Sequence, residues 1–169
     1  MGVAHIPLTS MKTLRSFRAI ALLPALSVGP PPAQPTLASL RHDYRPLLIF
    51  TADNQELRRQ LQMLAPRTVD LQQRQILVLP LPLHESEESR SRQEWRGILP
   101  EGEVSMLTPE ESAAARRRFR VSPDEFTVIL VGKDGGEKLR SRTPVTIDTL
   151  IHLIDAMPMR QKEVRDGQP

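Results

Sequence analysis

The chain has 169 residues, a formal net charge of +3 at pH 7 and no cysteine. The lack of cysteine excludes thiol catalysis, disulfide exchange and thiolate-bound zinc or iron–sulfur sites, whatever the fold. The length fits one domain that is stable without disulfides or metal. Aromatic residues make up only 4% of the chain, which predicts a core of leucine, isoleucine and valine.

The basic excess is confined to the first forty residues. Lys12, Arg15 and Arg18 are the only charged residues before Arg41. These three belong to a total of 23 lysine and arginine residues, which leaves 20 to balance the 20 acidic residues. Because the rest of the chain is neutral overall and few aromatic residues lie among its arginines, we predict no nucleic-acid binding.

Residues 1–34 are typical of a secretory signal peptide followed by a proline-rich spacer. From Met11 onward, a positively charged segment precedes an apolar run at residues 19–28, which is too short to span a membrane. We therefore predict a start at Met11, cleavage of the leader, a periplasmic or secreted protein, and no transmembrane segment. An uncleaved, disordered tail is the alternative.

Two apolar runs predict interior strands, at residues 46–51 and 75–81. Asp53 or Asn54 can cap a helix between them, which Pro66 kinks or ends. That helix carries three leucines at helical spacing: Leu57, Leu61 and Leu64. A strand–helix–strand segment of this length predicts parallel pairing through a right-handed crossover.

Residues 84–105 are rich in charge and predict an exposed, mobile insertion. His84 and nearby glutamates could form a metal site, but a solvated loop is the favoured interpretation. A helix then begins at Thr108, with Pro109 in its first turn and Glu111 completing a capping box. Four arginines close that helix, and compensation of the helix dipole is favoured over phosphate binding for them: Arg116, Arg117, Arg118 and Arg120.

A strand and a hairpin follow at residues 126–141. The run at residues 126–131 is apolar and β-branched, and Gly135 and Gly136 suit the tight turn before a charged edge strand at residues 137–141. The last helix has an apolar stripe opposite three polar residues: Asp148, His152 and Asp155. A solvated face is favoured over a metal site for these three, and we predict no metal and no cofactor.

The predicted element order is strand, helix, strand, helix, strand, strand, helix. This order is that of a minimal thioredoxin-like α/β core, a small mixed sheet with helices on both faces. We place this domain at residues 44–163, and we predict a short extension after Pro158 and a disordered tail at residues 164–169.

The hairpin segment at residues 132–141 and the segment at residues 154–160 together resemble a family of domains of unknown function called P-DUDES. Members of that family are bacterial exported proteins and repeated domains of vertebrate sushi-repeat and coiled-coil-containing matrix proteins. The resemblance spans residues 44–163. It implies a thioredoxin-like, peroxiredoxin-related fold and an extracytoplasmic location, and it implies no catalytic residue.

The position of the working thiol in thioredoxin-like enzymes, just after the first core strand, corresponds here to residues 51–56. No residue there can act as a redox nucleophile. The proline that such enzymes place directly before the next central strand is also displaced, because Pro123 lies three residues ahead of Phe126.

We therefore expect an exported, non-catalytic module that binds another protein or an envelope component of unknown identity. The candidate interaction surface combines the hairpin with the segment after Pro158: Lys133, Asp134, Lys138, Arg140, Arg142, Met159 and Arg160. The alternative role for the hairpin charges is to prevent unwanted strand pairing. The alternative function is an enzyme without thiol chemistry, in which His42, Asp43 and Tyr44, or Asp53, perform acid–base catalysis.

Overall fold

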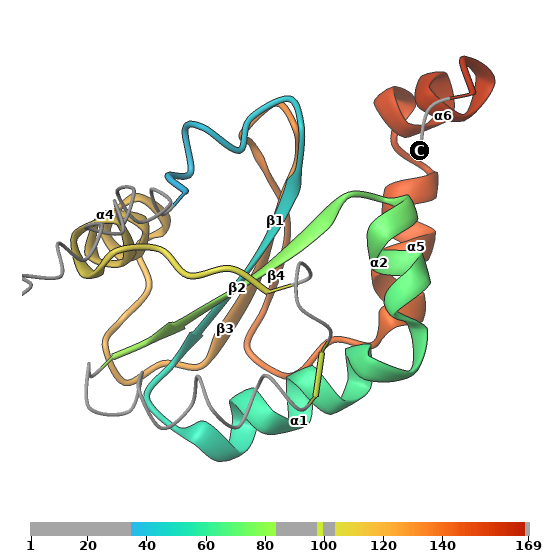
Figure 1. The fold of residues 1–169 in the computed structure, drawn as a ribbon. Coiled ribbons are helices and arrows are strands. Elements are labelled where there is room, and N and C mark those ends of the chain that lie inside the picture. The colour runs from blue at the N-terminus through green and yellow to red at the C-terminus, as the bar shows by residue number, and fades with distance from the viewer. Residues whose placement is uncertain (1–34, 84–97, 100–103, 168–169) are drawn as a thin grey trace, which may run out of the picture. The chain divides into compact units, whose positions relative to one another are not determined.

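The computed structural model describes residues 35–83, 98–99 and 104–167. They build a four-stranded mixed sheet in the order β2-β1-β3-β4 (Figure 1). Strands β1 and β2 are parallel, whereas β3 is antiparallel to both β1 and β4. The strands are β1 (Arg45–Thr51), β2 (Ile76–Pro82), β3 (Thr127–Val131) and β4 (Glu137–Ser141).

Helices cover both faces of this sheet. Helices α1, α2 and α5 cover one face and α4 covers the other, while α6 follows α5 beyond the end of the sheet (Figure 1). A single 3-10 turn joins α1 to α2. The helical segments are α1 (Asn54–Leu64), η1 (Ala65–Arg67), α2 (Thr68–Gln73), α4 (Pro109–Phe119), α5 (Ile147–Asp155) and α6 (Pro158–Arg165).

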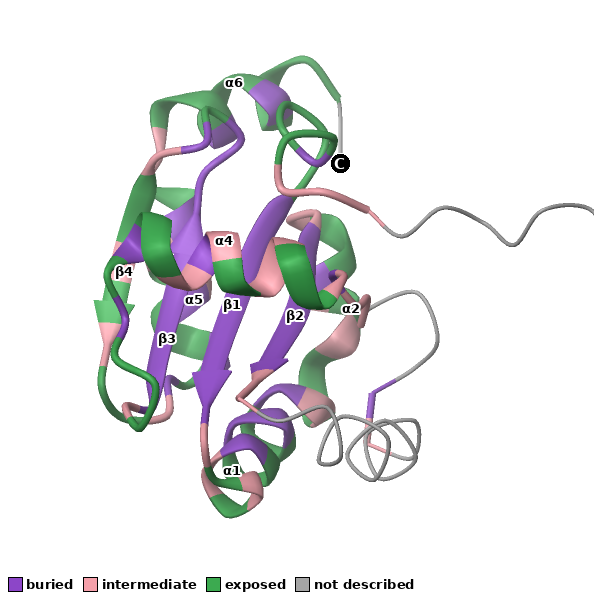
Figure 2. Cartoon of the chain, turned by 90° about the vertical axis from the view of Figure 1, so that its left-hand side faces the viewer, coloured by how far each residue is buried: buried purple, intermediate pink, exposed green. Residues whose placement is uncertain are grey.

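The interior strands are buried on both faces, as their continuous apolar runs predict. Successive residues of β1 alternate between two cores: Leu47 and Ile49 pack with α1, α2 and α5, whereas Leu48 and Phe50 pack with α4. Strands β1, β2 and β3 are almost entirely buried, whereas edge strand β4 is largely exposed (Figure 2). The thioredoxin-like architecture predicted from the sequence is therefore confirmed.

Three features differ from the expected pattern. Helix α1 ends at Leu64, next to Pro66 as predicted, but an unpredicted 3-10 turn and helix α2 follow it, and the segment after Pro158 forms the regular helix α6, which reaches Arg165. Part of the predicted exposed insertion is integrated into the domain, because Leu99 is buried in a core and Val104 pairs with Val78 of β2. Residues 84–97 and the predicted signal at residues 1–34 lie outside the described residues.

Among the described segments, no helix has both the length and the apolar character needed to cross a membrane.

Candidate functional site

The carboxyl end of β1 corresponds to the thiol position of thioredoxin-like enzymes. Thr51 is buried, and its Oγ1 donates to the carbonyl of Asp53 at 2.5 Å and accepts from the Asp53 amide at 2.9 Å. The Asp53 carboxylate in turn accepts from the Gln55 amide at 2.8 Å and caps α1. Both polar side chains therefore hold the turn from strand to helix, which is a structural role.

The predicted acid–base residues lie at the two ends of β1. His42 precedes the strand, is exposed, and has a positive φ of 75°, with its amide donating to the carbonyl of Lys133 at 2.9 Å. Asp43 and Tyr44 are exposed beside it. Asp53 follows the strand, and a seven-residue strand spans roughly 20 Å. The structure therefore does not bring His42 and Asp53 together.

Two of the three polar residues on the outer face of α5 form ion pairs with arginines at the two ends of α2. Asp148 pairs with Arg67, and the Asp155 carboxylate accepts two hydrogen bonds from Arg74, at 2.7 and 2.9 Å. His152 contacts the carbonyl of Asp148 through Nδ1 at 2.7 Å. These ion pairs fasten α2 to α5, and the part of the chain that is described contains no cluster of metal-binding side chains.

Two of the four arginines near the end of α4 bind backbone carbonyls. Arg116 donates to the carbonyls of Leu81 and Ser122, both at 3.1 Å, and its guanidinium lies 5.2 Å from the centre of the Phe50 ring. Burial lowers the pKa of Arg116 from its ordinary value. Arg118 donates to the carbonyl of Gly135 in the hairpin turn at 2.6 Å.

The hairpin turn itself is held in place by neighbouring segments. Gly135 has a φ of 80°, which favours glycine, and its amide donates to the carbonyl of Gly132 at 2.8 Å. Arg41, from the segment before β1, donates to the carbonyl of Asp134 at 2.9 Å, while Arg118 reaches the turn from α4. The turn is thus fixed on two sides and forms a rigid projection.

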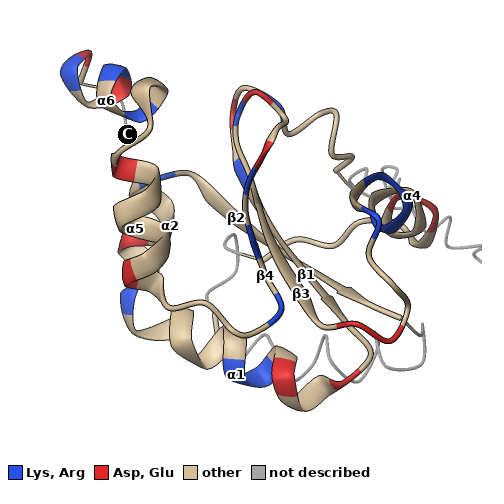
Figure 3. Cartoon of the chain, turned by 180° about the vertical axis from the view of Figure 1, so that it is seen from behind, with Lys and Arg blue, Asp and Glu red and all other residues tan. Residues whose placement is uncertain are grey.

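The exposed hairpin charges form local ion pairs. Lys138 pairs with Asp134 at 2.7 Å, and this hydrogen bond is the main cause that lowers the pKa of Asp134. On the neighbouring part of the hairpin, two arginines make similar pairs, each at 2.7 Å: Arg140 with Glu137, and Arg142 with Glu125. Pairs of this kind stabilise a fold by about 0–1 kcal/mol each, so they leave the charges available at the surface (Figure 3).

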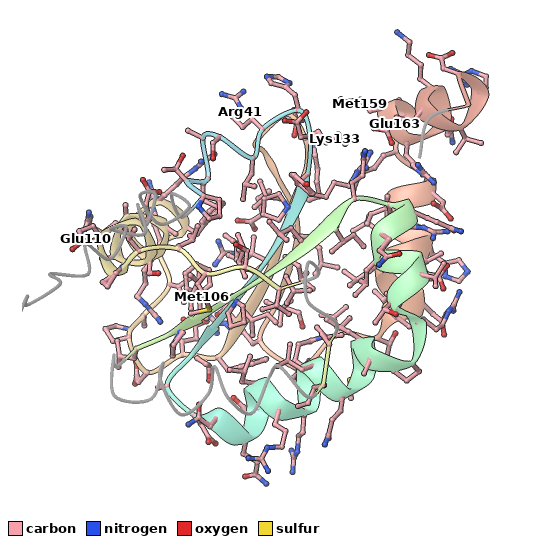
Figure 4. All side chains as sticks on the ribbon, in the orientation of Figure 1. Arg41, Met106, Glu110, Lys133, Met159 and Glu163 are labelled. Carbon is pink, nitrogen blue, oxygen red and sulfur yellow. The ribbon has the colours of Figure 1, made fainter. Side chains whose placement is uncertain are left out.

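Two members of the predicted interaction surface are not on the surface. Lys133 is 8% exposed and Arg160 is 7% exposed. Both are drawn inward by the carboxylate of Glu163, which lies in α6 opposite the start of the hairpin turn (Figure 4). The exposed part of that surface is therefore reduced to Asp134, Lys138, Arg140 and Arg142, with Met159 exposed on α6.

Glu163 is the centre of an ionic cluster at the amino end of β1. Arg45, which is 1% exposed, donates from Nη2 to both carboxylate oxygens of Glu163 at 2.9 Å. The Nζ of Lys133 lies 2.8 Å from Glu163 Oε1, and Nη1 of Arg160 lies 3.5 Å from Oε2. Arg45 also donates to the carbonyl of Arg74 at 2.9 Å. One carboxylate thus joins the first strand, the hairpin and the last helix.

The surroundings of Glu163 favour its charged form. Burial alone would raise its pKa, but hydrogen bonds from Lys133 and Arg45 and the charges of both residues outweigh that effect, so the pKa lies below its ordinary value. Glu163 is therefore a carboxylate at neutral pH, with three cations around it.

Helix α6 buries charged residues and exposes apolar ones, which is the reverse of an ordinary surface helix. Its buried residues are the charged Arg160 and Glu163, whereas the apolar Met159 and Val164 are 48% and 59% exposed. Hydrophobic burial therefore contributes little to its attachment, and the ionic cluster holds it at the end of the sheet where β1 begins. The sequence reasoning missed Arg45 and Glu163, and the only local signal was a single acidic residue among the basic residues of this segment.

These features define the class of protein. A mixed four-stranded sheet with one parallel crossover, an antiparallel hairpin and helices on both faces is a thioredoxin-like fold, and this chain has no cysteine at the position where thiol enzymes of that fold carry one. The chain belongs to the family described as Domain of unknown function (DUF4174), whose model matches residues 36–163. No curated protein matches the sequence.

Solved structures with similar folds include peroxiredoxins and a copper-bound ScoI. A yeast mitochondrial 1-Cys peroxiredoxin is similar with a TM-score of 0.56 at 13% identity, over 76% of this chain and 70% of that chain. The reduced 2-Cys peroxiredoxin of Plasmodium vivax gives 0.54 at 13% identity, over 75% and 84%. ScoI of Arabidopsis thaliana with copper bound gives 0.52 at 15% identity, over 77% and 88%. At these identities the likeness shows the fold alone.

Proposed function

We propose that this chain is an exported, non-catalytic thioredoxin-like module that binds another protein or a component of the cell envelope. The observation that carries the proposal is the carboxyl end of β1. There Thr51 and Asp53 use their polar atoms to build the turn and cap the helix, and the sequence contains no cysteine. The fold is thus kept without the residue that gives its enzymes thiol chemistry.

Export is supported by the leader. A basic segment after Met11, an apolar run and a proline-rich spacer form the pattern of a cleaved secretory signal. The motifs that resemble P-DUDES support the same location, since proteins of that family are exported. This domain has no cysteine and therefore no disulfide, and its two buried hydrophobic cores stabilise it instead.

The hairpin is the favoured contact surface for a protein partner. Its turn is anchored from two sides by Arg41 and Arg118, so little conformational entropy is lost when it binds. Five charged side chains are exposed along it: Asp134, Glu137, Lys138, Arg140 and Arg142. A partner would therefore meet a rigid projection of mixed charge.

The test combines localisation with partner capture from cells. The tagged full-length protein is recovered from separated periplasmic and cytoplasmic fractions after in-cell crosslinking, and mass spectrometry identifies its N-terminus and its crosslinked partners. We expect a cleaved periplasmic protein with one reproducible partner. An uncleaved cytoplasmic protein would contradict export, and the absence of any partner would contradict the binding role.

A pair of charge reversals tests the hairpin separately. Arg140→Glu combined with Arg142→Glu should abolish capture of the partner, because both changes fall on the proposed contact surface. The matched control is Arg58→Glu combined with Arg59→Glu, which reverses two exposed charges on α1. Equal capture by both double variants would show that the hairpin is not the contact surface.

A further inference from the structure

An open groove of about 470 Å³ runs along α6 where it meets the ends of α2 and α5. Its lining is rich in arginine and consists of Arg74, Asp155, Arg160, Gln161, Val164 and Arg165. The groove lies at the opposite end of β1 from the thiol position, and it adjoins the ionic cluster through Arg160. It has the size of a site for a small molecule or a few residues of a peptide.

The lining contains three arginines and one carboxylate, and that carboxylate is already occupied. Asp155 accepts from Nε and Nη2 of Arg74 at 2.9 and 2.7 Å, a bidentate pair that uses both of its oxygens. Its distance to Nε of Arg160 is 3.9 Å, which is too long for a hydrogen bond. The groove therefore keeps a positive excess.

Arg160 is incompletely paired within the chain. Its side chain is 9% exposed, its Nε has no hydrogen-bond partner, and its Nη1 reaches Glu163 only at 3.5 Å. A buried guanidinium nitrogen without a partner is unfavourable. An anion in the groove would give this Nε a hydrogen-bond partner.

We propose that this groove is an oxyanion-binding site, in which Arg160 and Arg165 bind a carboxylate or phosphate group of a ligand. The planar guanidinium group matches both kinds of anion through paired hydrogen bonds. Gln161 offers a neutral amide donor, and Val164, which is 59% exposed, offers apolar contact beside the charge. This inference rests on one part of the proposed function, namely that the chain is a binding module. It adds the chemistry of one ligand that the module would bind.

The test is a titration of the ¹⁵N-labelled full-length protein followed by NMR. Inorganic phosphate, citrate and a short glutamate-rich peptide are the probes, with sodium chloride at matched ionic strength as the reference. We expect saturable shifts of amides in α6 and at the end of α5 with at least one probe. Saturation by phosphate alone identifies a phosphate ligand, whereas saturation by citrate or the peptide identifies a carboxylate.

Variants of two exposed cations on α6 provide the matched comparison. Arg165 lines the groove and Lys162 does not. Arg165→Gln should weaken binding by about threefold to tenfold, whereas Lys162→Gln should leave it unchanged, although both remove one charge from the same helix. Arg160→Gln should weaken binding by about tenfold or more. Arg160 is buried, so Arg160→Gln could unfold the domain. In that case the comparison of Arg165→Gln with Lys162→Gln still tests the proposal.

Two results would overturn the inference. One is the absence of saturable shifts with all three probes. The other is an equal loss of affinity in Arg165→Gln and Lys162→Gln, which would show general attraction to a basic helix. A protein that captures its partner in cells but binds no probe would contradict the oxyanion site and leave the binding module intact, so the two proposals fail separately.

Discussion

The two ends of β1 differ in how they use polar residues. At the carboxyl end, Thr51 and Asp53 make ordinary short-range hydrogen bonds that begin a helix. At the amino end, Arg45 is buried and forms ion pairs with Glu163, which lies 118 residues away in the sequence. At the end that carries the chemistry of thiol enzymes, the polar residues of this chain make turn and cap contacts, whereas the buried ion pairs lie at the other end.

This difference shows that the distinctive polar contacts of this chain lie at the opposite end of β1 from the turn into α1. Short-range caps such as that of Asp53 occur in many helices and indicate no particular function. A buried carboxylate surrounded by three cations is costly to desolvate and is a far more specific feature. Variants at the two ends of β1 can therefore compare how much each kind of polar contact contributes in this chain.

The largest expected effect follows from the loss of the central carboxylate. Glu163→Gln leaves Arg45, Lys133 and Arg160 buried without a counter-ion, and should destabilise the domain by about 3–5 kcal/mol in urea unfolding. Glu137→Gln, which removes an exposed carboxylate paired with Arg140, serves as the control and should cost less than about 1 kcal/mol. Similar losses in the two variants would remove the contrast between the cluster and ordinary surface pairs.

The pH dependence of the same variant sharpens the comparison. Because the pKa of Glu163 in the folded protein lies below its ordinary value of 4.5, its stabilising effect is complete above that pH and is lost as the pH falls through the folded-state pKa. The difference in unfolding free energy between wild type and Glu163→Gln should therefore be constant near pH 7 and shrink below pH 4.5. Asp70 and Asp134, whose pKa values are also lowered, are present in both proteins and cancel. A difference that stayed constant to pH 3 would contradict this assignment.

A cysteine introduced after the carboxyl end of β1 tests whether this position favours the thiolate form of the side chain. In Asp53→Cys the sulfur stands at the N-terminus of α1, where the helix dipole should lower its pKa from about 8.5 by roughly one unit. Met63→Cys, exposed in the last turn of the same helix, is the control and should show no lowering. The pH dependence of alkylation by iodoacetamide measures both, and equal pKa values would show that this end no longer favours a thiolate.

The smallest effect concerns the cap itself. Asp53→Ala removes the hydrogen bond to the Gln55 amide and should cost about 1 kcal/mol in unfolding free energy. Asp53→Asn keeps an accepting oxygen and should be close to wild type. A cost for Asp53→Asn as large as that for Asp53→Ala would mean that the charge of Asp53, and not its cap, matters at this end.

The fold could be predicted from the sequence because its main signals are local. Apolar runs predicted the interior strands, and Thr108 and Pro109 predicted the start of α4, where the Glu111 amide donates to Thr108 at 3.2 Å. Helix α6 escaped prediction as a regular element because Met159 and Val164 face solvent, whereas the charged Arg160 and Glu163 face inward. Periodicity of apolar residues cannot reveal a helix that is attached through ion pairs.

The ionic cluster could not be predicted for a different reason. Lys133 and Arg160 resemble surface residues in the sequence, and only the position of Glu163 in space explains why they are buried. The partners come from β1, the hairpin and α6, so no spacing within one segment reports their proximity. The role of the exposed hairpin charges as a contact surface remains a prediction. Their ion pairs within the chain are compatible with contact to a partner.

The pairing of Arg45 with Glu163 also has a consequence for synthesis and folding. Glu163 leaves the ribosome 118 residues after Arg45, so this contact cannot form until the chain between them has emerged. Contacts between distant parts of a sequence slow folding, because the chain between them must first be ordered. During translation Arg45 is therefore without its final counter-ion, and completion of the domain waits for its last helix.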